Sequence, residues 1–282
     1  MEYNELLYDV SDHIATVTLN RPDKLNAWTF SLEKEYRHAM AAAEADPEVR
    51  VIILTGAGKG FCAGADMSLL TSVQDGSINM DDAAAAGELK PGDHPDARED
   101  FKKQYSFPLA IRKPVIGAIN GAAVGLGFVH ALYCDVRFAA HEAKFSTTFV
   151  QRGLIGEYGI AWLLPRLVGP QVAFDLLYTG RIFKGEEAER MGLVLRSVPG
   201  EELMETARAY ARELIAKSSP RSMGVIKRQV YDALHTGLGP ACDVALQEML
   251  ESLGSDDFRE GLMAYLEKRT PDFPAPAAPA TK

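Results

Sequence analysis

Two glycine-containing turns constrain this chain more than any other feature of its sequence. The first, FCAGADM at residues 61–67, follows the strand-like apolar run VIILTG at 51–56. The second, NGAAVGLG at 120–127, follows PVIGAI at 114–119. Turns between a strand and a helix expose backbone N–H groups at the helix start, where the helix dipole also favours negative charge. Two such groups aimed at one point form an oxyanion hole, which is a recurrent catalytic device.

Composition and charge exclude several classes of function. The chain has 282 residues, of which 47% are hydrophobic, and this is enough for one large core or for a core with a small helical domain. No run of about 18 uninterrupted apolar residues occurs, so we expect no membrane span. The formal net charge of −9 argues against non-specific binding of nucleic acid. Local recognition of a polyanionic ligand stays compatible with that charge.

The first residues and the cysteines predict a cytoplasmic protein. The acidic start, MEYNE, lacks the basic and apolar regions of a secretory signal, so we expect none. Cys62, Cys134 and Cys242 are widely spaced and odd in number, which fits reduced thiols better than a disulfide framework. His94 and His141 lack partners at metal-ligand spacing, and we therefore predict no metal site.

Alternating strand-like and helix-like segments predict an α/β fold in the first part of the chain. Residues 6–10 and 14–19 alternate in polarity around a turn, and the run at 51–54 is apolar throughout, as in a strand covered on both faces. Apolar residues three or four apart predict a helix over 31–45. We expect further short strands at 136–139 and 144–146. The segment 71–105 is polar, irregular and longer than an ordinary loop, which indicates a mobile or functional region.

The second part of the chain is mainly helical in its pattern. We predict helices over 161–168, 172–178, 186–191, 201–216, 220–234 and 241–268, with a strand at 193–198. This change predicts a core domain at 1–200 and a helical domain at 201–270. Residues 271–282 are rich in proline and alanine, and we predict that they form a disordered tail.

A third motif, RPDKLNA at 21–27, precedes the two turns. Together the three motifs resemble the crotonase superfamily, the enoyl-CoA hydratase/isomerase family, in order and in spacing. The resemblance runs from about residue 5 to about residue 268. It implies a spiral of ββα units with a C-terminal helical domain that packs homotrimers, often paired into hexamers. It also implies an acyl-CoA thioester as substrate, with no cofactor besides the coenzyme A that the substrate carries.

The resemblance assigns roles to residues of the motifs. The backbone N–H groups of Ala65 and Leu126 would be the two oxyanion donors, which stabilise a developing enolate and so acidify the α-carbon of the thioester. Leu126 stands where glycine is common, but a backbone donor tolerates that change. The nucleotide and pantetheine path would be lined, largely by main-chain groups, by Lys24, Leu25, Ala27, Ala63, Asp66 and Met67. Asp66 is equally interpretable as the N-cap of the helix that follows.

The chain departs from the family where the hydratases carry their two glutamates. Val129 and Phe149 occupy the corresponding positions, and neither can hold a water molecule or transfer a proton, so the usual two-carboxylate addition of water lacks both groups. Glu157, in GLIGEYG at 153–159, is the remaining candidate, because isomerase and dehalogenase branches of the family place a carboxylate in this loop. Its apolar surroundings would raise the carboxyl pKa toward that of a proton shuttle. The alternative is a surface carboxylate at a helix start.

Two neighbouring residues receive structural interpretations. His130 follows Val129, but adjacent helical residues point about 100° apart, so we interpret His130 as a structural histidine with satisfied hydrogen bonds. Tyr158 is interpreted as packed.

The leading hypothesis is an acyl-CoA enzyme of the hydratase/isomerase family in which Glu157 transfers protons beside an enolate. Isomerisation of a double bond fits better than hydration, because it needs one base that removes and returns a proton. A hydrolase, in which Glu157 activates water against a thioester or a ring ketone, is the second hypothesis. A protein that binds CoA esters without turnover is the third.

Overall fold

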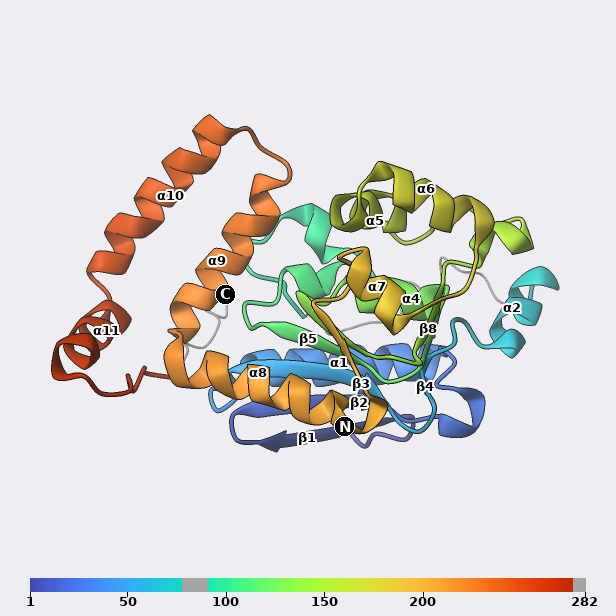
Figure 1. The fold of residues 1–282 in the computed structure, drawn as a ribbon, viewed down its shortest axis with the longest axis horizontal. Coiled ribbons are helices and arrows are strands. Elements are labelled where there is room, and N and C mark those ends of the chain that lie inside the picture. The colour runs from blue at the N-terminus through green and yellow to red at the C-terminus, as the bar shows by residue number, and fades with distance from the viewer. Residues whose placement is uncertain (78–90, 276–282) are drawn as a thin grey trace.

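The computed structural model describes residues 1–77 and 91–275, and its strands form two sheets (Figure 1). The larger sheet has six strands, whose spatial order is β1 (Leu6–Ser11), β2 (Ile14–Leu19), β3 (Val51–Gly56), β5 (Val115–Ile119), β7 (Val136–Ala140) and β10 (Arg196–Val198). The smaller sheet has four, in the order β4 (Gly60–Cys62), β6 (Ala122–Val124), β8 (Lys144–Ser146) and β9 (Phe183–Lys184). The α/β architecture predicted from the sequence is confirmed.

The larger sheet begins as a hairpin and continues in parallel. β1 and β2 are antiparallel, and the turn between them holds Asp12 and His13 at φ values of 51° and 62°. Two central residues with positive φ are the turn geometry that best follows the twist of a hairpin. Each later neighbour, from β2–β3 through β7–β10, pairs in parallel. β3 lies between β2 and β5, which explains why its first five residues are buried without alternation.

The smaller sheet brings together the two turns found in the sequence. β4 and β6 are parallel neighbours, with Cys62 paired to Ala123. Each turn includes residues of one of these strands: residues 63–67 of the first turn follow β4, and residues 125–127 of the second turn follow β6, where α4 (Leu126–Leu132) begins. Because parallel neighbours end at the same edge of a sheet, the two turns lie side by side.

Helices cover the sheets and continue beyond them. Their bounds are α1 (Phe30–Ala45), α2 (Met67–Gln74), α4 (Leu126–Leu132), α5 (Ile160–Val168), α6 (Pro170–Thr179), α7 (Gly185–Arg190), α8 (Leu203–Lys217), α9 (Pro220–Ala233), α10 (Leu238–Leu253) and α11 (Asp256–Glu267). α1 packs on β1 and β2, whereas α8 packs on β3, β5 and β7. The single helix predicted over 241–268 is wrong, because the chain breaks into α10 and α11 at Gly254. The Ser255 side chain then caps α11 by accepting the N–H of Phe258 at 3.1 Å.

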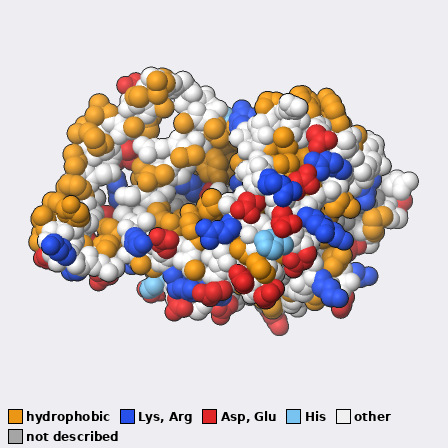
Figure 2. Space-filling model, in the orientation of Figure 1, with side chains coloured by type: hydrophobic (Ala, Val, Ile, Leu, Met, Phe, Trp, Pro, Cys, Tyr) orange, Lys and Arg blue, Asp and Glu red, His pale blue; other side chains and the backbone are white. Residues whose placement is uncertain are grey.

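The helices α9, α10 and α11 extend away from the sheets as an arm (Figure 1). Hydrophobic side chains lie along the visible surface of this arm (Figure 2). The exposed large apolar residues of α10 and α11 are Leu238, Val244, Leu246, Met249, Leu250, Leu253, Phe258, Leu262, Met263, Tyr265 and Leu266. Exposed apolar side chains gathered on one element are typical of surfaces that associate with other chains.

The residues after α11 return to the body. The Phe273 side chain is buried, and its carbonyl accepts a hydrogen bond from Arg50 Nη2 at 2.8 Å. Of the tail predicted as disordered, residues 271–275 therefore make contacts, and 276–282 lie outside the described residues. The residues of α8 fall within the predicted helical domain at 201–270, but this helix packs on the larger sheet. The domain boundary near residue 200 stays a prediction.

The apolar arm generates a prediction about assembly. We expect light scattering to give a mass near three or six times 30.7 kDa, because association would remove the apolar side chains of α10 and α11 from water. The measurement uses the full chain at micromolar concentration. A clean monomer would contradict both the assembly and the role of the arm in it.

Candidate functional site

The two turns approach so closely that side chains are excluded between them. Gly64 has φ +99°, and a Cβ built on it would lie 2.9 Å from the carbonyl oxygen of Val124. A Cβ on Gly127 would lie 1.9 Å from the carbonyl oxygen of Cys62. A side chain at either position would run into the backbone of the other turn, so both glycines are required for space, and Gly64 is required for its positive φ as well.

Two backbone N–H groups of these turns have no acceptor within the described residues. Trp28 forms a parallel bridge to Ala65, in which Trp28 N–H donates to Gly64 at 2.7 Å and Asp66 N–H donates to the Trp28 carbonyl at 2.9 Å. The N–H of Ala65 therefore points away from Trp28. Leu126 is the first residue of α4, where an N–H has no partner within the helix. In residues 1–77 and 91–275, neither of these two N–H groups donates to an acceptor of the chain.

Apolar side chains flank the second turn. Val129 is fully buried in α4, and the ring of Phe149 is 6% exposed. The Phe149 ring lies beside Gly125, because a Cβ on that glycine would be 3.8 Å from Phe149 Cε1. Neither side chain carries a group that can transfer a proton.

Glu157 lies half-buried in the loop that leads into α5. Burial raises the pKa of its carboxyl, as expected for a carboxyl in apolar surroundings. The next residue, Tyr158, has φ +52°, and its carbonyl accepts a hydrogen bond from the Tyr133 hydroxyl at 2.8 Å. This contact fixes the backbone of the loop directly beside Glu157.

An aromatic cluster connects the loop at Glu157 with α1 and α4. The rings of Tyr105 and Tyr158 meet edge to face with centroids 4.6 Å apart. The Tyr105 ring in turn contacts His130 at 5.4 Å, and the His130 ring stacks on Trp28 at 3.9 Å. The packed position predicted for Tyr158 is confirmed.

His130 is buried but has no hydrogen-bond partner for either ring nitrogen within the described part of the chain. The prediction that its hydrogen bonds are satisfied is therefore wrong. Burial lowers the pKa of His130 to about 3, so the ring is neutral at physiological pH. The neutral His130 ring therefore contributes through its packing against neighbouring aromatic rings.

Glu33 is a functional candidate that the sequence reading missed. Its carboxylate accepts a hydrogen bond from the Trp28 indole N–H at 2.9 Å. Burial raises the pKa of Glu33, although the indole, the Arg37 guanidinium and the side chains of Gln104 and Tyr105 oppose that rise. Glutamate in the first turn of a helix is ordinarily a complement to the helix dipole, so the sequence held no signal for this contact.

The residues predicted to line the coenzyme A path gather at the edge of the two turns. Ala63 N–H donates to the carbonyl of Leu25 at 3.0 Å, which joins the first turn to the segment of Lys24, Leu25 and Ala27. Lys24, Leu25 and Met67 are exposed there. These positions are open to a ligand that approaches from solvent.

Asp66 is held by neighbouring side chains. Its carboxylate accepts hydrogen bonds from the backbone and hydroxyl of Ser68 at 3.0 and 2.8 Å, and from Arg21 Nη1 at 2.9 Å. The Ser68 bonds, together with Arg21, lower the pKa of Asp66 to about 2. This arrangement gives Asp66 the local contacts of a cap for α2.

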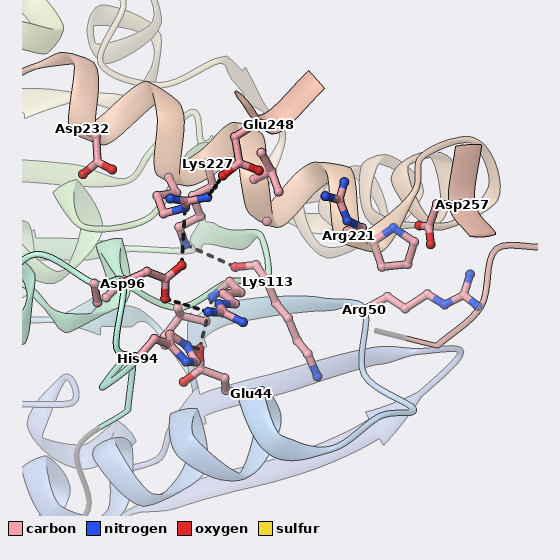
Figure 3. Close-up of a pocket in the computed structure, with 18 of the residues that line it drawn as sticks. Glu44, Arg50, His94, Asp96, Lys113, Arg221, Lys227, Asp232, Glu248 and Asp257 are labelled. Atoms are coloured by element: carbon pink, nitrogen blue, oxygen red, sulfur yellow. Dashed lines mark hydrogen bonds and ion pairs between the residues drawn. The ribbon is translucent and has the colours of Figure 1, made fainter. Parts of the chain in front are cut away.

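A cavity of about 580 Å³ lies elsewhere, between α9 and the body (Figure 3). None of the predicted site residues lines it. Several of its charged side chains pair with one another or with nearby groups. Among these pairs are Lys227 with Asp135 at 2.7 Å, Arg112 with Asp96 at 2.7 Å, and His94 with Glu44 at 2.7 Å. The cavity is therefore better explained as part of the junction with the arm than as the catalytic site.

No group of three or more His, Cys, Asp or Glu residues is arranged to hold a metal ion in residues 1–77 and 91–275. No helix within those same ranges is long and apolar enough to cross a membrane.

Comparisons with known proteins identify the family. The family model for enoyl-CoA hydratase/isomerase matches residues 9–276. The 1,2-epoxyphenylacetyl-CoA isomerase of Escherichia coli K12 is 34% identical over 273 residues, which cover 95% of this chain and 97% of that protein. A Rhodobacter capsulatus protein named "Probable enoyl-CoA hydratase" is 37% identical over 280 residues, covering 97% of this chain and 99% of the relative.

The solved structures agree with the sequence comparisons. Enoyl-CoA hydratase from Bacillus anthracis superposes with a TM-score of 0.84 at 29% identity, covering 97% of this chain and all of that one. The chain belongs to the enoyl-CoA hydratase/isomerase family, and its fold is the crotonase fold with C-terminal helices. The names of the relatives include both an isomerase and a hydratase, so membership leaves the reaction to be argued from the site.

Glu44, at the C-terminal end of α1, joins that helix to residues 92–112. Its carboxylate accepts hydrogen bonds from His94 at 2.7 Å, from Gly92 N–H at 2.8 Å and from Arg112 N–H at 3.1 Å. Burial pushes the pKa of Glu44 upward, but the bond and charge of His94 and the two backbone bonds outweigh it, and the pKa is lowered. The charged carboxylate thus stabilises the folded chain.

Glu44→Gln should lower the free energy of unfolding at pH 7 by about 1–3 kcal/mol. The buried donors of His94, Gly92 and Arg112 would then face a neutral amide group in place of a carboxylate. A group whose pKa is lowered by folding stabilises above its unfolded pKa of about 4.3, and this contribution disappears as the pH falls through the folded value. Urea unfolding should therefore give a smaller difference between the variant and the wild type at pH 3 than at pH 7. The exposed Glu48→Gln serves as the control. An equal difference at both pH values would contradict the role of the charge.

Proposed function

We propose that this protein acts on an acyl-CoA thioester by forming an enolate beside the two turns. The N–H groups of Ala65 and Leu126 would donate to the thioester oxygen as it gains negative charge, and each such donor contributes about 2.7–4 kcal/mol in measured enzymes. The observation that carries the proposal is the presence of two N–H groups with no acceptor in the described chain, held on turns that meet backbone to backbone.

Glu157 is the proposed proton-transfer residue. Its carboxyl is half-buried, and burial raises its pKa, which makes it a stronger base than an exposed glutamate once it is ionised. The hydrogen bond from Tyr133 to the Tyr158 carbonyl fixes the loop on which Glu157 lies. Glu157 would remove a proton from the substrate and return it at another carbon.

Isomerisation of a double bond is the reaction that these residues favour. Hydration in this family requires groups that orient and deprotonate water, and Val129 and Phe149 present only hydrocarbon beside the second turn. The same shortage of groups disfavours hydrolysis, which needs a second proton donor for the leaving atom. A binding protein without turnover would have no use for a carboxyl held in apolar surroundings.

The coenzyme A portion would bind along Lys24, Leu25, Ala27, Ala63, Asp66 and Met67. The exposed Lys24 ammonium supplies positive charge for phosphates, while main-chain groups of this edge supply hydrogen bonds. Since coenzyme A arrives with the substrate, the proposed reaction uses no separate cofactor and no metal. We further propose a cytoplasmic homo-oligomer, a trimer or a hexamer, that binds neither nucleic acid nor membrane.

Hydration of crotonyl-CoA tests the missing glutamates. We expect the chain to hydrate this short 2-enoyl-CoA very slowly beside an ordinary hydratase of the family, since each lost acid or base typically costs about 10²–10⁴-fold. The assay follows loss of the conjugated thioester absorbance with both enzymes at equal concentration. Hydration at a rate comparable with the ordinary hydratase would overturn the assignment of Val129 and Phe149.

Glu157→Gln tests the proton-transfer residue itself. The substitution preserves shape and removes basicity, so turnover should fall by about 10²-fold or more while acyl-CoA affinity changes little. Exchange of the α-protons of butyryl-CoA in deuterated water, followed by NMR, should fall in parallel. The exposed Glu186→Gln is the matched control and should exchange at the wild-type rate.

The pH profile adds a second readout for Glu157. Because burial raises its pKa, the wild-type exchange rate should rise with pH through a midpoint above the ordinary glutamate value of about 4.3. Glu157→Gln should lack this acid limb. A variant that retains near-normal exchange with an unchanged profile would make Glu157 a helix-start carboxylate only.

A further inference from the structure

Trp28 touches both segments that carry the proposed oxyanion donors. Its backbone N–H and carbonyl bridge Gly64 and Asp66, the two neighbours of Ala65, at 2.7 and 2.9 Å. Its indole ring stacks on His130 with centroids 3.9 Å apart and an interplanar angle of 29°. His130 belongs to α4, one helical turn after Leu126. One residue therefore contacts the first turn by its backbone and the helix of the second turn by its side chain.

Glu33 determines the orientation of that indole. The carboxylate of Glu33 accepts the indole N–H at 2.9 Å, and Glu33 itself lies in the first turn of α1. The Trp28 ring is 2% exposed and meets Tyr36 edge to face at 5.5 Å. A buried indole N–H without an acceptor costs free energy, so removing Glu33 would favour a rotated or displaced ring.

His130 offers the indole a flat apolar face. Its ring is 1% exposed, lies between Trp28, Tyr36 and Tyr105, and has no hydrogen bond through either nitrogen within the described residues. The unpaired nitrogens mean that contact area alone holds the ring in place. A shift of the Trp28 ring would consequently be passed to α4 by packing.

We propose that Glu33 is a positioning residue that acts through Trp28 to hold the N–H groups of Ala65 and Leu126 in register. The proposal rests on the enolate chemistry proposed above. Donors fixed in advance toward a developing charge work only when their geometry is kept, and small displacements reduce the rate steeply. Glu33 touches neither donor, and its effect is transmitted by the indole that it orients.

The experiment measures enolate stabilisation directly. Acetoacetyl-CoA has an acidic proton between its two carbonyl groups, and loss of that proton gives an enolate with strong near-ultraviolet absorbance. Oxyanion donors lower the apparent pKa of the bound ester, which is read from absorbance against pH, whereas affinity is read from titration. This signature reports the donors and does not require knowledge of the natural acyl group.

Two substitutions at Glu33 distinguish the effect of its hydrogen-bond acceptor from the effect of its side-chain size. Glu33→Gln keeps an oxygen that accepts the indole N–H, so the enolate fraction should stay within about threefold of the wild type. Glu33→Leu has similar size and no acceptor, and we expect the enolate fraction to fall by about tenfold or more with little change in affinity. Butyryl-CoA exchange should fall with it. Glu48→Leu, on an exposed glutamate, is the control.

Trp28→Phe supplies the second arm of the test. It removes the indole N–H and keeps an aromatic ring against His130, so it should lower the enolate fraction about as much as Glu33→Leu. The double variant should be no worse than either single one, because both act on the same hydrogen bond. If Glu33→Leu fails to fold by circular dichroism, Trp28→Phe alone decides, and a wild-type enolate fraction in the folded variant overturns the proposal.

Each other outcome is equally decisive. Equal losses in Glu33→Gln and Glu33→Leu would assign the effect to the negative charge of Glu33 and reject positioning through the indole. A wild-type enolate fraction in Glu33→Leu would also reject it. If the wild-type protein binds acetoacetyl-CoA without lowering its pKa, the enolate chemistry of the proposed function is refuted, independently of any variant.

Discussion

The backbone contact between the two turns is the constraint on which the rest of the site depends. A Cβ on Gly127 would lie 1.9 Å from the Cys62 carbonyl, and a Cβ on Gly64 would lie 2.9 Å from the Val124 carbonyl. This approach is possible because β4 and β6 are parallel neighbours that end at one sheet edge. Contacts between main-chain atoms depend little on nearby side chains. The turns can therefore hold the same geometry while the residues around them vary, and only the two glycines are fixed by the approach itself.

Burial shifts the pKa values of Glu157 and His130 in opposite directions. It raises the pKa of Glu157 and lowers that of His130, because burial disfavours whichever form carries the charge. A carboxyl responds by becoming a better base when ionised, whereas an imidazole responds by staying neutral. The same physical cause thus raises the basicity of the ionised Glu157 carboxylate, which suits the proton transfer proposed for it, and restricts His130 to packing. Sequence position alone cannot separate these cases, since both residues stand in segments with many apolar neighbours.

Much of the fold could be predicted from the sequence, because strands and short helices follow local patterns of polarity. The longest predicted helix, 241–268, was wrong at Gly254, where the cap by Ser255 ends one helix and starts another. The two turns were also recognisable, since their glycines are local signals, whereas the role of Glu157 stays a prediction. The contact of Glu33 with Trp28 was not, because the two residues meet only after α1 has formed and no pattern marks the pair. Whether a buried histidine finds hydrogen-bond partners likewise depends on tertiary packing.

The division between backbone and side-chain groups suggests how one fold supports several reactions of acyl thioesters. In the proposed mechanism the enolate is held by N–H groups of Ala65 and Leu126, which every residue except proline supplies. The fate of the enolate depends instead on which side chains stand near its carbons. In the same proposal, Val129 and Phe149 take no part in proton transfer, and Glu157 supplies a carboxylate from a different loop. Changing the reaction therefore requires few substitutions and no rebuilding of the turns, whereas a side chain at Gly127 would disrupt every reaction that uses the enolate.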